Sequence, residues 1–373
     1  MSTSFLPRDI HAYLAAKVLG QAGVLRLISV SLYKHIHGLK AGNVLFIGNS
    51  GTGKTTVMRA ISQFYEDHEE LSAFRTMIII NANTLAPEVE GEDRATRLFR
   101  RIEARVRALY GAELTAARIK EAMENATVCV DEVDKISARM SGKANVEGIT
   151  TQYALLTLLE GEDILYRTTV RDEEGRMVET DIPIDTSKLL FICGGAFEEL
   201  YDQVYTLLVN RRDDRRLKET SEVDRQPDGT VKVRTVVRFR LKDYLRLSDL
   251  FTYGMMPQFV SRFSTLAIFE ELGRDELKKI MLTADDSPLR ASRDYFRHMG
   301  VTLRLTDKAL DQIAEHAMKN TRIGARALRE IYTGLIADYE FDPSISPKLA
   351  RTEKGQVLTI DQEAVADYLG GVE

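Results

Sequence analysis

The sequence predicts an α/β protein with two parts, a large domain built on a parallel five-stranded sheet and a smaller, mainly helical domain behind it. Short apolar runs alternate with helical stretches as far as residue 270, which is typical of parallel strands joined by crossover helices. After Gly273, apolar residues recur mostly at helical spacing. With 373 residues, the chain is long enough for two or three domains.

The strand and helix candidates divide the chain near residue 272. Strands are predicted at residues 43–47, 76–81, 127–131, 189–193 and 265–269. We expect the large domain to cover residues 1–271 and the small domain residues 272–373. In the small domain, helices are predicted at 275–284, 287–298, 307–320 and 325–340, and strands at 301–305 and 357–360.

Two segments interrupt the alternation within the large domain. Residues 164–184 consist of two extended arms around the polar turn Asp172-Glu173-Glu174-Gly175, which predicts a hairpin. Residues 210–246 are a charged insertion that opens with an arginine-rich block at 211–216 and later runs into the extended stretch 231–235. Most charged blocks of this kind are solvated loops.

Composition and charge exclude several classes of protein. Hydrophobic residues make up 44% of the chain and charged residues 29%, which excludes a disordered tail and a fibrous repeat. The sum 51 − 56 gives a net charge of −5, so no overall positive field attracts nucleic acid or an anionic membrane. No membrane span or signal peptide is evident, and we expect a soluble, cytoplasmic protein. The two cysteines, Cys129 and Cys193, lie in apolar strands and are expected to be small buried side chains.

A phosphate-binding loop is the strongest signal in the sequence. Gly48-Asn49-Ser50-Gly51-Thr52-Gly53-Lys54-Thr55 is an unbroken G-x-x-x-x-G-K-T directly after the apolar run 44–47. Its glycines let the backbone curl so that amide N–H groups at a helix N-terminus point at phosphate oxygens. We expect Lys54 to lie against the β- and γ-phosphates and the Thr55 hydroxyl to ligate Mg²⁺, with Thr56 among the nucleotide contacts.

An acidic pair, Asp131 and Glu132, ends the strand predicted at 127–131. Because the end of a strand beside the phosphate loop lies close to the phosphates, these carboxylates are the second half of the predicted site. We expect Asp131 to hold the Mg²⁺ through water. Glu132 is the candidate general base, which orients and polarises the water that attacks the γ-phosphorus.

Together these motifs resemble the AAA+ ATPases, and within them the ClpX- and HslU-like protein unfoldases. Further segments extend the resemblance over residues 5 to 345. They are Val18-Leu19-Gly20-Gln21, Lys135-Ile136-Ser137, Val146-Glu147-Gly148 and residues 155–161, 185–197, 253–262 and 324–329. The resemblance implies ATP as the nucleotide, Mg²⁺, a homo-oligomeric ring that we expect to be a hexamer, and a protein client.

The resemblance also implies roles for four residues that spacing alone does not single out. Val18 and Leu19 would pack on the adenine. Arg262 corresponds to the arginine finger, which reaches the γ-phosphate bound by a neighbouring subunit, and Arg326 to the second sensor, which reports the nucleotide state. A planar, permanently charged guanidinium suits the charge that develops in phosphoryl transfer, and a residue supplied by a neighbour implies a closed ring. Either arginine could instead be a surface or interface salt-bridge residue.

The chain departs from the family pattern in its recognition elements. No Cys-x-x-Cys pair precedes the ATPase motifs, so we expect the family's N-terminal zinc-binding domain to be absent. In the loop that lines the central pore, Val89 and Glu90 replace the aromatic and aliphatic residues, which weakens the grip on an extended chain unless another loop provides it. No Ile-Gly-Phe or Leu-Gly-Phe tripeptide lies between Phe197 and Asp249, so we expect no docking on the ordinary ClpP peptidase.

Two further departures concern sensing and partners. The strand that should carry the first sensor ends in Cys193-Gly194-Gly195, without a polar candidate. If the insertion is functional, its arginine-rich block and the basic residues Lys232, Arg234, Arg238 and Arg240 point to an acidic partner protein or to nucleic acid, and nucleic acid is expected to bind only there.

The sequence leaves three functions open. The first is a ring-forming, ATP-dependent remodeller or unfoldase of a dedicated protein partner, and the complete nucleotide motifs favour it. The second is a switch or scaffold that does not translocate protein and controls a nuclease, a transposition factor or another effector. The third is an unfoldase that serves a peptidase other than ClpP.

Overall fold

The computed structural model describes residues 5–85, 94–140, 142–210, 219–225, 231–237, 239–319, 324–353 and 355–371. The chain divides into two compact units. Unit 1 comprises Met1–His11, Gly23–Ile47 and Met58–Ile268, and unit 2 comprises Ala12–Ala22, Gly48–Val57 and Phe269–Glu373. Unit 2 therefore contains the phosphate loop in addition to the C-terminal region.

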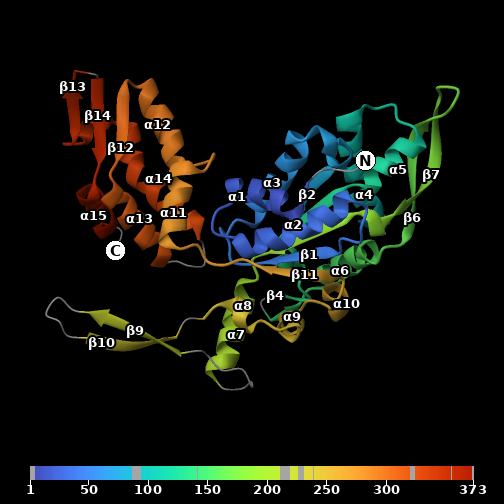
Figure 1. Ribbon diagram of the computed structural model, residues 1–373, viewed down its shortest axis with the longest axis horizontal. Coiled ribbons are helices and arrows are strands. Elements are labelled where there is room, and N and C mark those ends of the chain that lie inside the picture. Colours follow the sequence, from blue (N-terminus) through green and yellow to red (C-terminus); the bar gives the residue numbers. More distant parts are fainter. Residues whose placement is uncertain are drawn as a thin grey trace. The chain divides into compact units, whose positions relative to one another are not determined.

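The centre of unit 1 is a parallel five-stranded sheet with the strand order β11-β1-β8-β3-β2 (Figure 1). Its strands are β1 (Asn43–Ile47), β2 (Met77–Asn81), β3 (Thr127–Asp131), β8 (Leu190–Gly195) and β11 (Phe263–Ile268). Every neighbouring pair is parallel. The predicted fold class is confirmed, because strands buried on both faces are nearly continuous apolar runs that the sequence shows directly.

Ten helices and several short turns belong to the first 260 residues of the described chain. The helices are α1 (Pro7–Lys17), α2 (Ala22–Ile36), α3 (Lys54–Asp67), α4 (Arg94–Tyr110), α5 (Ala116–Glu124), α6 (Val146–Leu159), α7 (Glu198–Val209), α8 (Leu241–Tyr244), α9 (Leu247–Tyr253) and α10 (Pro257–Val260). A minor pair of strands, β4 (Arg139–Met140) and β5 (Lys143–Ala144), precedes α6. Short 3₁₀ turns lie at Glu69–Phe74, Ala82–Leu85, Val133–Ile136 and Thr186–Lys188.

The main core of unit 1 lies on one face of the sheet. Leu45, Val128 and Phe191 from three strands belong to one buried cluster with side chains of α4, α5 and α6. Both cysteines are buried as predicted, and burial raises the pKa of each thiol above its usual range. A buried thiol with a raised pKa is unreactive at neutral pH, since the thiolate is the reactive form.

An antiparallel hairpin lies at the segment 164–184 for which the sequence predicts one. Its strands are β6 (Asp163–Arg171) and β7 (Met177–Asp185). The inner face is buried through Tyr166, and the Tyr166 hydroxyl donates to Glu103 of α4 at 2.5 Å. Burial raises the pKa of Glu103, but hydrogen bonds from Thr168, Tyr166 and Arg107 outweigh it and leave the pKa below its ordinary value. The hairpin is therefore fixed to α4 by a charged, hydrogen-bonded contact.

The charged insertion contains a second antiparallel pair, β9 (Glu219–Arg225) and β10 (Val231–Val237). In its register, Lys232 lies opposite Asp224 and Arg234 lies opposite Glu222. Two of the basic positions of the insertion thus lie opposite acidic positions on the neighbouring strand. The arginine-rich block 211–216 and the pore-loop positions Val89 and Glu90 lie outside the described residues.

The C-terminal part of unit 2 is mainly helical, with one three-stranded sheet. Its helices are α11 (Arg274–Thr283), α12 (Pro288–His298), α13 (Asp307–Lys319), α14 (Ala325–Phe341) and α15 (Gln362–Gly370), with a 3₁₀ turn at Pro343–Ile345. The sheet has the order β12-β14-β13, from β12 (Val301–Leu305), β13 (Leu349–Thr352) and β14 (Gly355–Ile360). This C-terminal part has its own buried core, which includes Leu303, Ile313 and Tyr332.

The sequence analysis does not predict β13 or α15. Three of the four β13 residues are exposed, so the strand has no alternation of buried and exposed residues. Helix α15 buries Val365 and packs Ala364, Tyr368 and Leu369 against the same core, a short apolar stripe that the sequence analysis missed.

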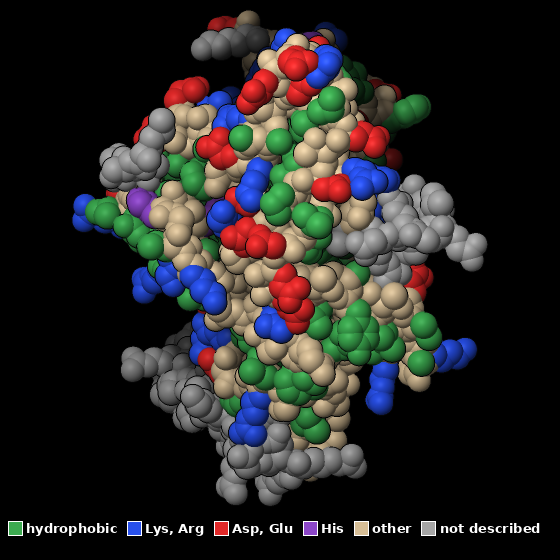
Figure 2. Space-filling model, turned by 90° about the vertical axis from the view of Figure 1, so that its right-hand side faces the viewer, with side chains coloured by type: hydrophobic (Ala, Val, Ile, Leu, Met, Phe, Trp, Pro, Cys, Tyr) green, Lys and Arg blue, Asp and Glu red, His purple; other side chains and the backbone are tan. Residues whose placement is uncertain are grey.

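Two features of the surface bear on possible partners. Within the described ranges, no helix is both long and apolar enough to cross a bilayer. Figure 2 shows acidic, basic and hydrophobic side chains intermixed on the face that it presents. The described residues visible on this face therefore form no extended patch of one charge.

Candidate functional site

The phosphate loop connects β1 directly to the N-terminus of α3. Gly51 and Gly53 have φ angles of 74° and 101°, which side chains other than glycine rarely adopt. The Lys54 Nζ donates to the carbonyl oxygens of Gly48 at 2.5 Å and Asn49 at 2.9 Å, and the Thr52 hydroxyl donates to Asn49 O at 2.8 Å. The lysine therefore folds back over the loop at a helix N-terminus, where phosphate oxygens are favoured.

Gln21 ties the loop to two other segments of unit 2. Its side-chain amide donates to Thr52 O at 3.1 Å and to Glu270 O at 2.8 Å, while its oxygen accepts from Glu270 N at 3.1 Å. Gln21 is almost fully buried. A buried amide with all three of these bonds made is costly to displace, so Gln21 holds the loop in register.

The start of α14 also contacts the phosphate loop. The Ala325 N–H donates to Gly51 O at 3.2 Å. A Cβ on Gly324, whose φ is 47°, would lie 2.9 Å from the same oxygen, so this approach requires glycine. Arg326, the predicted second sensor, follows directly and is exposed, whereas Val18 is buried and Leu19 is partly exposed. Unit 2 thus contains the predicted adenine, phosphate and second-sensor residues.

The acidic pair lies at the end of β3 in unit 1. Glu132 has φ 59° and ψ 36°, a left-handed conformation that is unusual for a side chain of this size. Asn81 ends the neighbouring strand β2 opposite Asp131, and its Nδ2 donates to Glu132 Oε2 at 2.5 Å. The Glu132 N–H donates to Asp131 Oδ1 at 2.9 Å. The carboxylate of Glu132 is therefore held by a neutral amide at the carboxyl edge of the sheet.

At the end of β8, a side chain would clash at Gly195 and would be tightly packed at Gly194. A Cβ on Gly194 would lie 3.0 Å from Met58 Cε and 3.5 Å from Asp131 Oδ1. On Gly195 it would lie 2.5 Å from Phe197 Cε2 and 2.8 Å from Asp134 Oδ1. Gly195 is therefore needed for the close packing against Phe197 and Asp134, whereas a small side chain at Gly194 would require the end of Met58 to shift.

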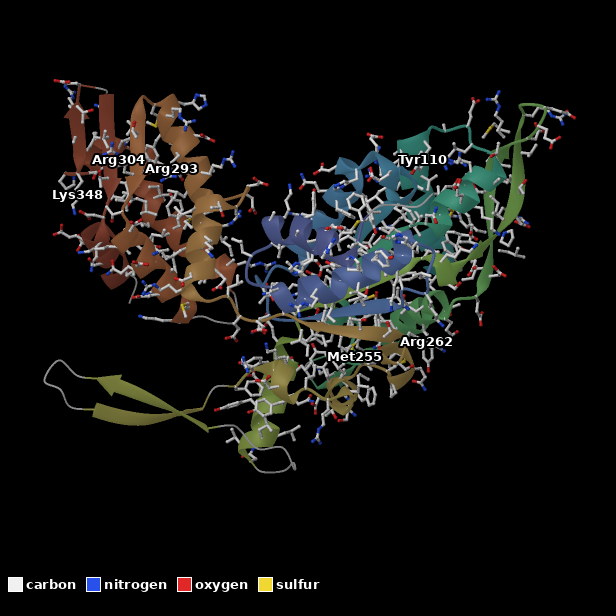
Figure 3. All side chains as sticks on the ribbon, viewed as in Figure 1. Tyr110, Met255, Arg262, Arg293, Arg304 and Lys348 are labelled. Atoms are coloured by element: carbon white, nitrogen blue, oxygen red, sulfur yellow. The ribbon has the colours of Figure 1, made fainter. Side chains whose placement is uncertain are left out.

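Arg262 lies between α10 and β11, beside α6 in Figure 3. Its NH2 group donates to Glu160 Oε1 at 2.6 Å. Its backbone oxygen accepts from Asn43 Nδ2 at 3.1 Å, which fixes the turn to the start of β1. The predicted arginine finger is thus paired within its own subunit, at the surface of unit 1.

The predicted residues therefore fall into two sets, one in each unit. In unit 2 the structure brings the loop Gly48, Asn49, Ser50, Gly51, Thr52, Gly53, Lys54, Thr55 together with the start of α14. In unit 1, Asp131 and Glu132 are consecutive residues at the end of β3, and Arg262 lies in a separate turn between α10 and β11. The Thr55 hydroxyl and the Asp131 carboxylate are hard oxygen donors of the kind that Mg²⁺ prefers. Among the described residues, no group of three or more His, Cys, Asp or Glu side chains is placed to hold a metal by itself.

Three residues of these sets escaped the sequence prediction. Asn81 is a polar residue that ends an apolar strand, as Asp131 does, and the same rule applied to β2 identifies it. Gln21 and Glu160 lie inside segments that carry the family resemblance, but their roles depend on partners 249 and 102 residues away in the chain.

Comparison with known proteins places these observations in a family. A model described as an AAA domain of the Cdc48 subfamily matches residues 39–265. The chain is 28% identical over 351 residues to the "ATP-dependent Clp protease ATP-binding subunit ClpX" of Porphyromonas gingivalis, a match that covers 90% of this chain and 77% of that protein. The identically named protein of Borrelia duttonii is 28% identical over 379 residues, with 96% and 79% covered. That of Bacteroides thetaiotaomicron is 26% identical over 359 residues, with 92% and 78% covered.

Proposed function

Because the chain belongs to the AAA domains of the Cdc48 subfamily, we propose that it is a ring-forming ATPase that remodels or unfolds a protein client. The predicted resemblance to ClpX-like AAA+ ATPases is confirmed, and the chain is an ATP hydrolase. The similarity to ClpX proteins extends over 90% of the chain and favours a remodeller over a switch that does no mechanical work.

The proposal mainly rests on two observations, the phosphate loop of unit 2 and the Glu132 carboxylate that Asn81 holds in unit 1. Lys54 and the loop amides bind the β- and γ-phosphates, and Val18 and Leu19 contact the adenine. Glu132 orients a water molecule for attack on the γ-phosphorus, which forms the new P–O bond as the bond to ADP breaks. When bound by Thr55 and Asp131, Mg²⁺ supplies positive charge that offsets the charge of the phosphates.

The proposed ring depends on Arg262. We assign Arg262 to the ATP of a neighbouring copy, in which case each site needs two subunits and the head-to-tail contact closes into a ring, for which we propose six subunits. Arg326 is proposed to report the nucleotide state from the start of α14. A permanently charged guanidinium suits both roles.

The partner is proposed to be a protein. The register of β9 and β10 places acidic positions opposite Lys232 and Arg234, so this strand pair is not the uniformly basic stretch that nucleic acid would require. Binding of nucleic acid would therefore depend on the insertion's other arginines. The missing tripeptide between Phe197 and Asp249 supports a partner other than ClpP.

A nucleotide-trapped variant tests the proposal. In Glu132→Gln, ATP should bind but hydrolyse slowly, so a client captured by the ring should remain bound. We would purify this variant from its host in ATP and identify proteins and nucleic acids that co-purify, with Lys54→Ala as the matched variant that cannot bind ATP properly. A protein retained only by Glu132→Gln, and released when ATP is removed, supports the remodeller.

Three results would contradict the proposal. Nucleic acid retained without protein, or an identical set of proteins on both variants, would leave no nucleotide-dependent client. An effector that binds the ADP and ATP states differently but is never altered in fold would favour the switch.

A further inference from the structure

The ion pair between Arg262 and Glu160 points to a role for Glu160 in orienting the arginine that is proposed to act on the neighbouring subunit. Glu160 Oε1 accepts from Arg262 NH2 at 2.6 Å, and the two residues are 102 positions apart in the chain. We propose that Glu160 is a positioning residue, which holds Arg262 in the extended orientation that reaches the γ-phosphate of the adjacent copy. This inference rests on the proposed role of Arg262.

The backbone that carries Glu160 is rigid. Glu160 caps the C-terminus of α6, where its N–H donates to Leu156 O at 3.0 Å. Leu158 and Leu159 directly before it are buried in the main core. Gly161 then turns the chain with φ +80°, and a Cβ there would lie 3.1 Å from Ser187 Cβ. A glycine after the C-cap ends the helix at a defined residue, so the Glu160 carboxylate starts from a fixed point.

The backbone that carries Arg262 is equally constrained. Phe259 and Val260 before it and Phe263 after it are buried. The short helix α10 is tied to α6, because Gln152 Oε1 of α6 accepts from the Met256 N–H at 2.8 Å. The same two elements that carry the arginine and the glutamate are thus joined a few residues away from the pair.

The Arg262–Glu160 ion pair is partly exposed and therefore adds little to the stability of the fold. We infer that its role is to orient the Arg262 side chain. The side chains of Arg262 and Glu160 retain 41% and 31% of their exposure, and solvent screens a pair of this kind strongly. The contact uses one amino group of a guanidinium that has five N–H donors, so donors remain for phosphate oxygens. Restricting the long arginine side chain before the phosphate arrives lowers the conformational entropy that is lost in binding it.

The pair also lies on a side of α6 that another copy can reach. Positions 146, 150, 153, 157 and 160 are all exposed and recur at helical spacing, so they form one stripe along the helix. Val146 and Tyr153 on this stripe are exposed to 71% and 57%. Glu160 is the last residue of the stripe, and Arg262 lies beside it.

Steady-state ATP hydrolysis by the full chain, measured over a range of protein and ATP concentrations, tests the inference. For Glu160→Ala we expect kcat to fall about tenfold with KM for ATP nearly unchanged, because only the transition-state contact of Arg262 is weakened. Glu160→Gln retains an accepting oxygen and should recover part of the loss. Glu162→Ala, an exposed glutamate two residues further on, is the matched control and should hydrolyse ATP normally.

A double-mutant cycle separates positioning from a structural role. In an Arg262→Ala background, Glu160→Ala should cause no further loss, because the residue it positions is absent. An equal loss with and without Arg262, or an unchanged kcat in Glu160→Ala, would overturn the inference while Arg262→Ala still showed its own defect. Full activity of Arg262→Ala would instead overturn the proposed role of Arg262, and with it this inference.

Discussion

The charged side chains of Glu132 and Arg262 each form a hydrogen bond with one side chain from another element. The partner of Glu132 is neutral, whereas the partner of Arg262 is negatively charged. Glu132 accepts from the neutral amide of Asn81, whereas Arg262 donates to the carboxylate of Glu160. A general base needs its negative charge, and a neutral donor orients it without compensating that charge. Arg262, as the proposed trans-acting arginine, has no phosphate in the free subunit, and the Glu160 carboxylate balances its charge while leaving other N–H donors for a phosphate.

The two positions also differ in backbone cost. Glu132 has a left-handed conformation, which costs about 1–3 kcal/mol for a residue other than glycine. Arg262 enters β11 without a positive φ. The strain at Glu132 is offset by β3, which is buried between β2 and β8, and by the hydrogen bond from its own N–H to Asp131.

The largest effect is expected from removing the arginine. Arg262→Ala should lower ATP hydrolysis by roughly 1,000-fold, because a guanidinium at the γ-phosphate stabilises the transition state by about that factor or more. Nucleotide affinity, measured by titration of a fluorescent ATP analogue, should change little. A variant that hydrolyses ATP fully at a dilution where only monomers exist would contradict the ring.

A smaller loss is expected from neutralising the base. Glu132→Gln should reduce kcat by roughly 100-fold, because the amide keeps its size but cannot polarise the attacking water. ATP should still bind and stabilise the assembled ring, which size-exclusion chromatography in ATP can detect. Unchanged turnover in Glu132→Gln would assign the base to another residue.

The smallest loss of kcat is expected from changing Asn81, the neutral partner of the proposed base Glu132. Asn81→Ala should lower kcat by about tenfold, because Glu132 loses the donor that orients it. Asn81→Asp should be worse than Asn81→Ala, since it places a second negative charge beside Glu132. Asn83→Ala, at an exposed position two residues further on, is the control. Equal activity of the Ala and Asp variants would show that the charge of the partner is unimportant.

Local patterns account for the parts of the fold that the sequence predicted well. The strands at 43–47, 127–131 and 301–305 have the predicted bounds, because each is a short apolar or alternating run between turn residues. The bounds of α12 and α13 differ from prediction by one residue at one end. Strand β13, with its exposed side chains, follows only from pairing with β14 and could not be found locally.

The candidate site divides in the same way. By itself, the sequence determined the phosphate loop, the acidic pair and the family, because glycine spacing and strand-end carboxylates are properties of consecutive residues. Only the tertiary structure decided that Asn81 holds Glu132, that Gln21 and the start of α14 contact the phosphate loop, and that Glu160 holds Arg262. These contacts join residues from 31 to 274 positions apart, since Gly51 meets Ala325 and Gln21 meets Thr52. Their geometry depends on how the strands and helices pack, which no local pattern encodes.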